Sequence, residues 1–313
     1  MRLLASMLLV SASAQADATP RYVMYYHSDA TPLSAMADTP YTHIILSFLR
    51  PTIEPDGSIG LISPPKLEPF WSDVPDLVSA GKKVLISFGG GLVTSADYAA
   101  LAGREAELAE RLAAFVVHKQ LQGIDIDYEA SDTFHLKRPS GVIDGRAFVI
   151  ALTRELRARL PAGKYLITHA PQPPYLDPGW HGGPYLDVLR AVGDAIDWIS
   201  VQYYDNPGFD KPVATHVVGL AEGASRTSYG ALVEHPDGPL WPSNRLVVGK
   251  PVYHADATSG YLAPTVVIDE IVRPLRARYG QSFGGLMGWQ FSNLTADHRA
   301  WNSVVGGAVL GED

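Results

Sequence analysis

The 313-residue chain contains no cysteine, and this absence excludes several kinds of chemistry. Without thiols the chain has no disulfide, no thiolate metal site and no cysteine nucleophile. Clustered positive charge is also lacking, because 25 Lys and Arg accompany 33 Asp and Glu and give a formal net charge of −8. Since nucleic acids and anionic membranes are bound by clustered lysines and arginines, we expect neither as a partner. Any catalysis must then use Asp, Glu, His, Ser, Thr or Tyr.

Long hydrophobic runs are scarce as well. Residues 3–10 form an apolar run that follows Arg2 and precedes small residues ending in Ala14-Gln15-Ala16. The run is shorter than the roughly 20 residues of a membrane span, but it has the order of a secretory signal peptide. A core helix is the alternative. We expect residues 1–16 to be a signal peptide, residues 17–313 to form the mature protein, and the protein to be secreted, either extracellular or periplasmic.

Short apolar runs rich in β-branched residues recur along the chain and predict strands. Between most of them lie segments with the helical spacing of apolar residues. Near-continuous apolar strands alternating with helices are typical of parallel strands covered on both faces. Eight such units fit an α/β fold, a single-domain (β/α)8 barrel, which needs about 250 residues. A doubly wound open sheet is the competitor, but no G-x-G-x-x-G follows the first strand. The expected strands are 22–26, 43–48, 83–88, 123–129, 165–170, 196–204, 245–253 and 285–291, and the expected helices are 95–119, 146–160, 185–195, 266–279 and one starting near 298 with Asp297 as its N-cap.

Residues 122–129, Gln-Gly-Ile-Asp-Ile-Asp-Tyr-Glu, are the most informative stretch. Strand alternation places Asp125, Asp127 and Glu129 on one face and apolar residues on the other. Buried carboxylates are costly and close ones cannot all ionise, so this arrangement favours general acid/base chemistry with Glu129 as the proton donor. The alternatives are a solvated edge strand and a Ca²⁺ or Mg²⁺ site. Same-face positions about 6.7 Å apart do not converge on an ion without a loop, so we expect no metal.

The same stretch resembles the D-G-x-D-x-D-x-E signature of glycoside hydrolase family 18, the chitinases and endo-β-N-acetylglucosaminidases, with Gln122 in place of the first Asp. Four further motifs resemble the family in the same order, and the five together span residues 41–293. Their style is closest to short, plant-type members without an inserted domain. The four motifs are Ser87-Phe-Gly-Gly90 for S-x-G-G, Ala170-Pro-Gln172 for A-P-Q, Gln202-Tyr-Tyr-Asp205 for Q-x-Y-N or M-x-Y-D, and Gly285-Leu-Met-Gly-Trp289 for the last strand.

The resemblance implies substrate-assisted catalysis, in which the acetamido group of the substrate is the nucleophile. Glu129 would protonate the leaving oxygen and then activate water, while Asp127 stabilises the acetamido group and shares a proton with Asp125. Tyr204 would orient the acetamido oxygen. No cofactor is implied. The expected substrate-binding residues are Trp289, Gln202, Asp205 and Gln172 from the motifs, and Tyr26, Phe48 and Trp180 from their places at strand ends or in a loop.

The expected function is that of a secreted, endo-acting and retaining chitinase that binds chitin or oligosaccharides containing N-acetylglucosamine, and acts as a monomer. Residues 254–284 leave no room for the α+β domain that some chitinases insert there, which favours an open groove. An endo-β-N-acetylglucosaminidase acting on N-glycans or wall glycans is the alternative. A non-catalytic, chitin-binding lectin-like protein is a further alternative, but such relatives typically lack the acid that Glu129 supplies. Nothing resembling a Ser/His/Asp arrangement surrounds His169 or His254, so we expect these histidines to be satisfied by hydrogen bonds.

Overall fold

The structure is a computed structural model that describes residues 20–27, 31–235 and 240–312, so the expected signal peptide lies outside the described residues. Eight parallel strands form a closed barrel in which each pairs with two neighbours and β1 and β2 close the ring. The expected (β/α)8 barrel is therefore confirmed. In the order in which they neighbour one another the strands are β1 (Arg21–Tyr26), β9 (Gly285–Trp289), β8 (Leu246–Pro251), β7 (Trp198–Gln202), β6 (Leu166–His169), β5 (Gly123–Asp127), β4 (Lys83–Gly89) and β2 (His43–Ile53).

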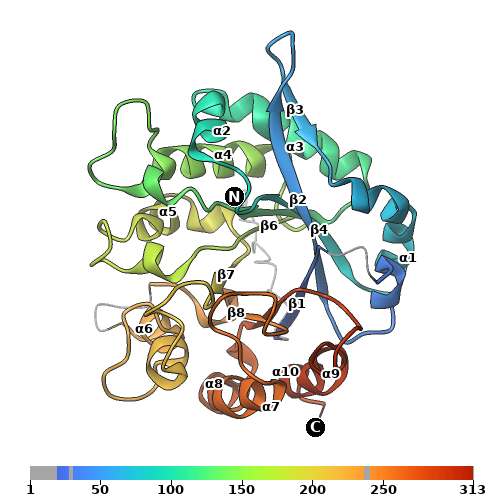
Figure 1. Ribbon diagram of the computed structural model, residues 1–313, viewed down its shortest axis with the longest axis vertical. Helices are drawn as coiled ribbons and strands as arrows, with labels where there is room; N and C mark the ends of the chain where they lie inside the picture. The colour runs from blue at the N-terminus through green and yellow to red at the C-terminus, as the bar shows by residue number, and fades with distance from the viewer. Residues whose placement is uncertain (1–19, 28–30, 236–239, 313) are drawn as a thin grey trace, which may run out of the picture.

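Helices surround the barrel and cover its outer face (Figure 1). Two of them are composite, because the π-helical turn Ile268–Val272 joins α7 to α8 and the turn Trp301–Val305 joins α9 to α10. Among the described residues, none of the helices is both long and apolar enough to cross a bilayer. The helices are α1 (Val74–Ser79), α2 (Ser95–Leu101), α3 (Glu105–His118), α4 (Gly145–Arg159), α5 (Pro184–Val192), α6 (Tyr229–Val233), α7 (Pro264–Val267), α8 (Arg273–Tyr279), α9 (Ala296–Ala300) and α10 (Gly306–Leu310).

The alternation of side chains along each strand divides the core into two clusters. The outer cluster fills the space between barrel and helices, and from β1 it takes Tyr22, Met24 and Tyr26. The inner cluster fills the barrel and from β1 takes Val23 and Tyr25. Both faces of every barrel strand are thus buried, which is why the strands read as continuous apolar runs.

Several boundaries differ from the sequence-based expectations for local reasons. The expected helix 95–119 is two helices, because Ala102 is extended and Gly103 has a φ of +79°. The last helix begins with Thr295 as its N-cap instead of Asp297, since the Thr295 side chain accepts a hydrogen bond from the backbone N–H of His298. One strand was missed: β3 (Ile59–Ile62) pairs antiparallel with the end of β2, and this hairpin projects beyond the helices at the top of Figure 1.

The connection from β8 to β9 contains only α7, α8 and short turns. The expected absence of an inserted α+β domain is therefore confirmed, and the barrel is a single domain. This connection passes close to the carboxyl ends of β7 and β9, where the side chains considered next are gathered.

Candidate active site

Strand β5 carries two of the three expected carboxylates into the barrel. On one side of β5, Ser87 and Gly89 of β4 lie opposite Asp125 and Asp127, respectively. On the other side, Thr168 of β6 lies opposite Asp125. Gly89 has a φ of +116°, and a Cβ there would lie 2.1 Å from the backbone oxygen of Asp127. A glycine at this position therefore lets β4 approach β5 closely where the carboxylates project.

Asp125 is the deepest of the carboxylates, fully buried and surrounded by hydroxyls. Its Oδ2 accepts hydrogen bonds from Tyr25 Oη (2.7 Å) and Ser87 Oγ (2.7 Å), and its Oδ1 accepts one from Thr168 Oγ1 (2.6 Å). Burial raises the pKa of Asp125 to about 6, although these three hydrogen bonds oppose the rise. Because both of its oxygens accept from hydroxyl groups, Asp125 is held in place and is not paired with its neighbour on the strand.

Asp127 lies one step closer to the mouth of the barrel and is 3% exposed. Burial, then the charges of Glu129 and Asp125, and a hydrogen bond to the Glu129 carboxyl raise the pKa of Asp127 well above its ordinary value. The two carboxyls are therefore hydrogen-bonded neighbours that hold one proton between them at a pH where separate carboxyls would both be ionised. The expected partner of Asp127 is Asp125, but the oxygens of Asp125 accept from three hydroxyls, and the carboxyl hydrogen-bonded to Asp127 is that of Glu129.

Glu129 follows the end of β5 and is partly exposed. Its backbone oxygen accepts a hydrogen bond from Ser131 N (2.8 Å), which fixes the chain as it leaves the strand. A Cβ at position 91 would lie 3.1 Å from Glu129 Oε2, so Gly91 leaves room for this carboxyl. Burial, the largest influence, raises the pKa of Glu129. An accessible carboxyl with a raised pKa suits a group that gives up a proton and later takes one.

Gln202, at the end of β7, holds the two upper carboxyls in place. Its Nε2 donates to Asp127 Oδ1 (2.8 Å), to Glu129 Oε1 (3.5 Å) and to the backbone oxygen of Ala170 (2.8 Å). We expected this side chain to bind substrate, but its N–H groups already bond to the protein. Its main effect is therefore to orient Asp127 and Glu129, which leaves only its amide oxygen for another partner.

Tyr204 belongs to the inner cluster and is 6% exposed. Burial and the charges of Asp127 and Glu129 raise the pKa of Tyr204 well above its ordinary value, so the phenol keeps its proton. Within the described ranges its hydroxyl makes no hydrogen bond to another residue. The site therefore presents a neutral O–H donor beside a carboxyl pair.

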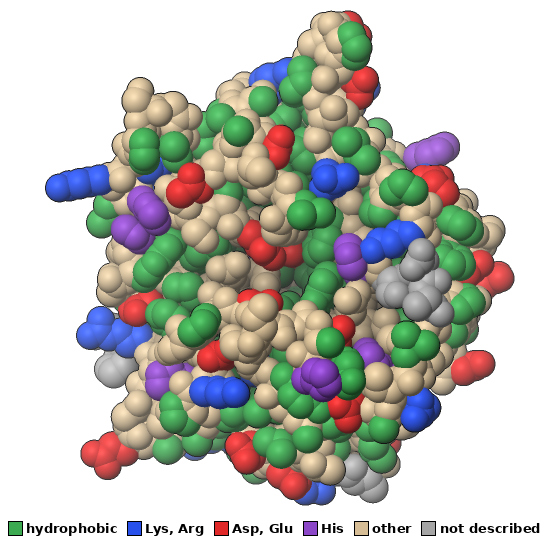
Figure 2. Space-filling model, viewed as in Figure 1, with side chains coloured by type: hydrophobic (Ala, Val, Ile, Leu, Met, Phe, Trp, Pro, Cys, Tyr) green, Lys and Arg blue, Asp and Glu red, His purple; other side chains and the backbone are tan. Residues whose placement is uncertain are grey.

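Aromatic side chains form one wall of the mouth. The rings of Phe48 and Trp289 are stacked with centroids 5.7 Å apart, and Tyr25 and His27 lie 5.8 and 5.4 Å from Trp289. Trp289 donates from Nε1 to the backbone oxygen of Asp256 (3.0 Å). Phe48 and Trp289 are partly exposed, and near the centre of the face seen in Figure 2 acidic side chains gather in a hollow with hydrophobic ones around it. Apolar ring faces beside carboxyls are suited to stacking on a sugar.

Tyr26 is a wrong prediction as a substrate-binding residue. It is fully buried in the outer cluster and donates to the backbone oxygen of Thr31 (2.7 Å), so it faces the helices. Its neighbour Tyr25 faces the barrel and binds Asp125. Sequence reasoning missed Tyr25, Ser87 and Thr168 as functional residues. The available signal was strand register, which sets inward-facing hydroxyls opposite Asp125.

The three remaining expected binding residues lie around this mouth in different settings. Asp205 is exposed, and its Oδ1 accepts from Thr258 N (2.6 Å), Thr258 Oγ1 (2.6 Å) and Ser259 N (3.3 Å), so it holds a loop. Gln172 is partly exposed directly after β6. Trp180 packs on Tyr175 with centroids 5.2 Å apart and joins the outer cluster, so it belongs to the core of its own loop and is not brought to the carboxyls.

The two histidines are in unrelated environments. His169 is fully buried, with Nδ1 2.8 Å from Tyr185 Oη and Nε2 3.3 Å from Thr153 Oγ1. Burial lowers the pKa of His169 to about 3, so it is a neutral core residue as expected. His254 is exposed and packs against Tyr253 in a tilted arrangement, with ring centroids 4.0 Å apart. Across the described parts of the chain, no group of three or more His, Asp or Glu side chains is arranged to hold a metal ion.

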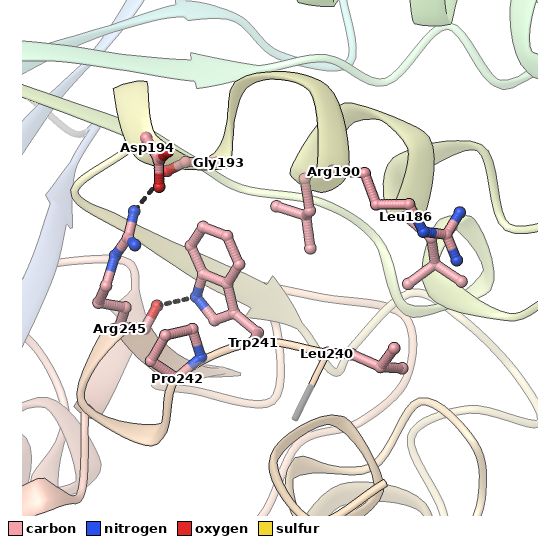
Figure 3. Close-up of a pocket in the computed structure, with 9 residues that line it drawn as sticks. Leu186, Arg190, Gly193, Asp194, Leu240, Trp241, Pro242 and Arg245 are labelled. Carbon is pink, nitrogen blue, oxygen red and sulfur yellow. Dashed lines mark hydrogen bonds between the residues drawn. The ribbon is translucent and has the colours of Figure 1, made fainter. Parts of the chain in front are cut away.

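Figure 3 shows a separate cavity of about 220 Å³ on the outer flank, between α5 and residues 240–245. Trp241 forms one wall and donates from Nε1 to the backbone oxygen of Arg245 (2.6 Å). Arg245 in turn donates to the backbone oxygen of Gly193 (2.5 Å). None of the expected site residues lines this cavity, which lies apart from the barrel mouth.

Comparisons with known proteins agree with the geometry at the barrel mouth. The family model for the glycosyl hydrolases family 18 matches residues 21–293. Chitinase D of Niallia circulans is 27% identical over 274 residues, which cover 79% of this chain and 50% of that protein. A chitinase of Enterococcus faecalis is 27% identical over 230 residues, which cover 70% of this chain and 62% of that protein. The chain therefore spans only about half to three fifths of the length of these curated relatives.

Solved structures give the same family, and they also show that proteins with a different named function share the fold. The crystal structure of a family 18 chitinase from Pseudoalteromonas aurantia has a TM-score of 0.78 and 34% identity, and the match covers 92% of this chain and 99% of that one. A xylanase and alpha-amylase inhibitor protein from Scadoxus multiflorus, 22% identical with a TM-score of 0.59, shares the fold over 94% of this chain and 98% of its own. The fold alone thus assigns no activity. The match of the family model over residues 21–293, together with the 34% identical chitinase structure, shows that the chain belongs to glycoside hydrolase family 18.

Proposed function

We propose that the protein is an endo-acting chitinase that hydrolyses β-1,4-linked N-acetylglucosamine polymers with retention of configuration. One observation carries the proposal. Asp127, the carboxyl next to the proton donor, is buried with its Oδ1 bonded to Gln202, and its surroundings raise its pKa, which favours the protonated form over a free carboxylate nucleophile. A retaining glycosidase without a free second carboxylate needs a nucleophile from the substrate, and a 2-acetamido group supplies one.

Glu129 and Asp127 would work as one titrating pair. When both carboxyls are protonated, Glu129 donates its proton to the leaving glycosidic oxygen as the acetamido oxygen attacks the anomeric carbon. The product of that transfer is a Glu129 carboxylate that accepts a hydrogen bond from the protonated Asp127, and the raised pKa of Asp127 favours this arrangement. The stabilised carboxylate then takes a proton from water as the water opens the cyclic intermediate.

Tyr204 would supply the remaining interaction. Its protonated hydroxyl, unbonded among the described residues and flanked by Asp127 and Glu129, can donate to the acetamido oxygen and hold it in line for attack. Phe48 and Trp289 would form the apolar floor under the same sugar. Asp125 supports the site indirectly, because its charge raises the pKa of Asp127 and helps to keep that carboxyl protonated.

Two observations support the proposed substrate class and the proposed cleavage at internal bonds. Proteins similar to this chain are named chitinase or endochitinase, among them Endochitinase A of Emericella nidulans, which is 28% identical over 235 residues. The β8–β9 connection carries no inserted domain, which favours an open groove and internal cleavage. Secretion is part of the same proposal and rests on the signal-like order of residues 1–16.

The test is hydrolysis of chitin oligosaccharides, with Glu129→Gln as the inactive control and Glu110→Gln, on an outer helix, as the matched active control. We expect internal cleavage of the N-acetylated oligomer and none of its fully deacetylated counterpart. Cleavage of both at comparable rates would contradict the acetamido mechanism. A high-mannose glycoprotein forms a third arm, and release of its glycan without cleavage of chitin oligomers would replace the chitinase proposal with the N-glycan alternative.

A further inference from the structure

Lys250 is a buried cation that the proposed chemistry does not use. It lies on β8, is fully buried, and donates from Nζ to the backbone oxygen of Tyr203 (2.6 Å). That oxygen belongs to the peptide bond immediately before Tyr204. The ammonium group therefore holds the backbone from which the expected substrate-orienting phenol projects.

A buried acid lies close to this cation. Asp210 is 3% exposed, and its charge is the one that raises the pKa of Lys250. Asp210 Oδ2 also accepts a hydrogen bond from Ser259 Oγ (2.5 Å). Asp210 therefore interacts both with the Lys250 ammonium and with Ser259, which belongs to the loop that follows β8.

We call residues 256–260 the brace loop, because they contact the backbone of Tyr204 from the other side. Asp205 accepts two hydrogen bonds from Thr258, as described above, and its backbone N–H donates to Ser259 O (3.4 Å). Gly260 has a φ of +84°, and a Cβ there would lie 2.6 Å from Tyr204 Cα. No side chain fits between the brace loop and Tyr204, so a shift of one moves the other.

We propose that Lys250 is a positioning residue for Tyr204, acting on the Tyr203 carbonyl directly and on the brace loop through Asp210 and Ser259. The inference rests on the proposed function, in which the Tyr204 hydroxyl orients the acetamido group. A loss of this support displaces the phenol without removing any group that touches substrate. Since a displacement of about 1 Å can cost roughly 100-fold in rate, the effect falls on kcat and leaves KM nearly unchanged.

The protonation of Lys250 gives the inference a second consequence. Burial lowers the pKa of Lys250, the charge of Asp210 opposes this and that of Lys211 adds to it, and the net result is a pKa of about 7. As the pH rises through this value the ammonium becomes a neutral amine, and its hydrogen bond to Tyr203 weakens because it is no longer assisted by charge. Arginine stays charged throughout this range. Lys250→Arg should therefore extend kcat to higher pH.

The experiment compares Lys250→Met, Lys250→Arg and a matched control, Lys164→Met, which removes an exposed cation from the opposite end of the barrel. On an N-acetylated chitin oligomer we expect Lys250→Met to lower kcat by about 10- to 100-fold with KM within about twofold, and Lys250→Arg to restore part of the loss. Lys164→Met should match the wild type. A folded Lys250→Met enzyme with unchanged kcat and pH profile would overturn the inference.

Two further measurements keep the result decisive. If Lys250→Met does not fold, Ser259→Ala removes the Asp210 hydrogen bond and leaves the buried charges intact, and an unchanged kcat would then overturn the inference. The backbone amide resonance of Tyr204, assigned by its loss from the ¹⁵N-tyrosine spectrum of Tyr204→Phe, reports the position of this residue without substrate. It should shift in the Lys250 or Ser259 variant and not in Lys164→Met. Inactivity of the wild type on every glycan arm would defeat the proposed function, whereas an unshifted Tyr204 resonance would defeat the positioning inference.

Discussion

Replacing Asp125 with Asn should make the folding stability of this barrel less dependent on pH. In the folded protein the pKa of Asp125 is raised from 3.8 to about 6, because the carboxyl is buried inside the barrel. A carboxyl whose pKa is raised by folding binds more protons in the folded state than in the unfolded one. Its contribution to stability is therefore complete below about pH 4 and is lost as the pH rises through 6.

The size of the effect follows from the same shift. At 1.36 kcal/mol for each pKa unit, the rise to about 6 makes the ionised carboxyl cost about 3 kcal/mol at neutral pH. Asparagine has nearly the same shape and no charge. Its oxygen can still accept hydrogen bonds from Tyr25 and Ser87, while the hydroxyl of Thr168 turns to accept from its amide. Loss of the Asp125 charge also lowers the pKa of Asp127, which acts in the same direction.

The assay is urea unfolding of the wild type and Asp125→Asn at pH 4, 5, 6, 7 and 8, with Asp38→Asn as an exposed control. The free energy of unfolding of Asp125→Asn, relative to the wild type, should rise by about 3 kcal/mol between pH 4 and pH 8. The control should follow the wild type. Parallel curves for Asp125→Asn and the wild type would refute the reasoning. They would show that burial does not raise the pKa of the Asp125 carboxyl to about 6.

Three further predictions concern single contacts. Tyr204→Phe removes the hydroxyl that would orient the acetamido group in the proposed mechanism. It should lower kcat about 10- to 100-fold on a chitin oligomer, and wild-type kinetics would contradict that role. Gly89→Ala places a Cβ 2.1 Å from the backbone oxygen of Asp127 and should destabilise the fold by about 3 kcal/mol or more in urea unfolding, so an unaltered midpoint would mean that β4 and β5 are less tightly packed. Thr295→Ala removes the N-cap of α9 and should cost about 1 kcal/mol in the same assay, whereas an equal loss in Asp297→Ala but not in Thr295→Ala would restore the cap expected from sequence.

The barrel and its acidic strand could be predicted from sequence because both leave a strong pattern. Strands covered on both faces are continuous apolar runs, and acids at alternate positions of such a run have no structural explanation. In β1 the pattern does not indicate which side chain faces the barrel interior, because Tyr25 and Tyr26 are both large aromatic residues. Which of them faces the barrel depends on register with β2 and β9. The sequence-based expectation named Tyr26 as a site residue, whereas Tyr25 is the one that faces the barrel.

The proton arrangement could not be predicted for a similar reason. Motifs specify that Asp125, Asp127 and Glu129 follow one another, and adjacency alone suggests that the two aspartates share a proton. The actual partner depends on hydroxyls from three other strands, which occupy Asp125 and turn Asp127 toward Glu129. Gln202 was similarly expected to bind substrate, and only the distances show that its N–H groups are used within the protein.

The pairing of the first strand, β1, with the last strand, β9, has a consequence for how the chain folds as it is synthesised. Arg21 pairs with Gly285, so the first strand has one of its two partners near the far end of the sequence. At the roughly 5–20 residues per second of ribosomal synthesis, β1 waits for this partner for tens of seconds. Until then the nascent chain keeps an open sheet edge and an unsealed interior, and such an edge can pair with other chains.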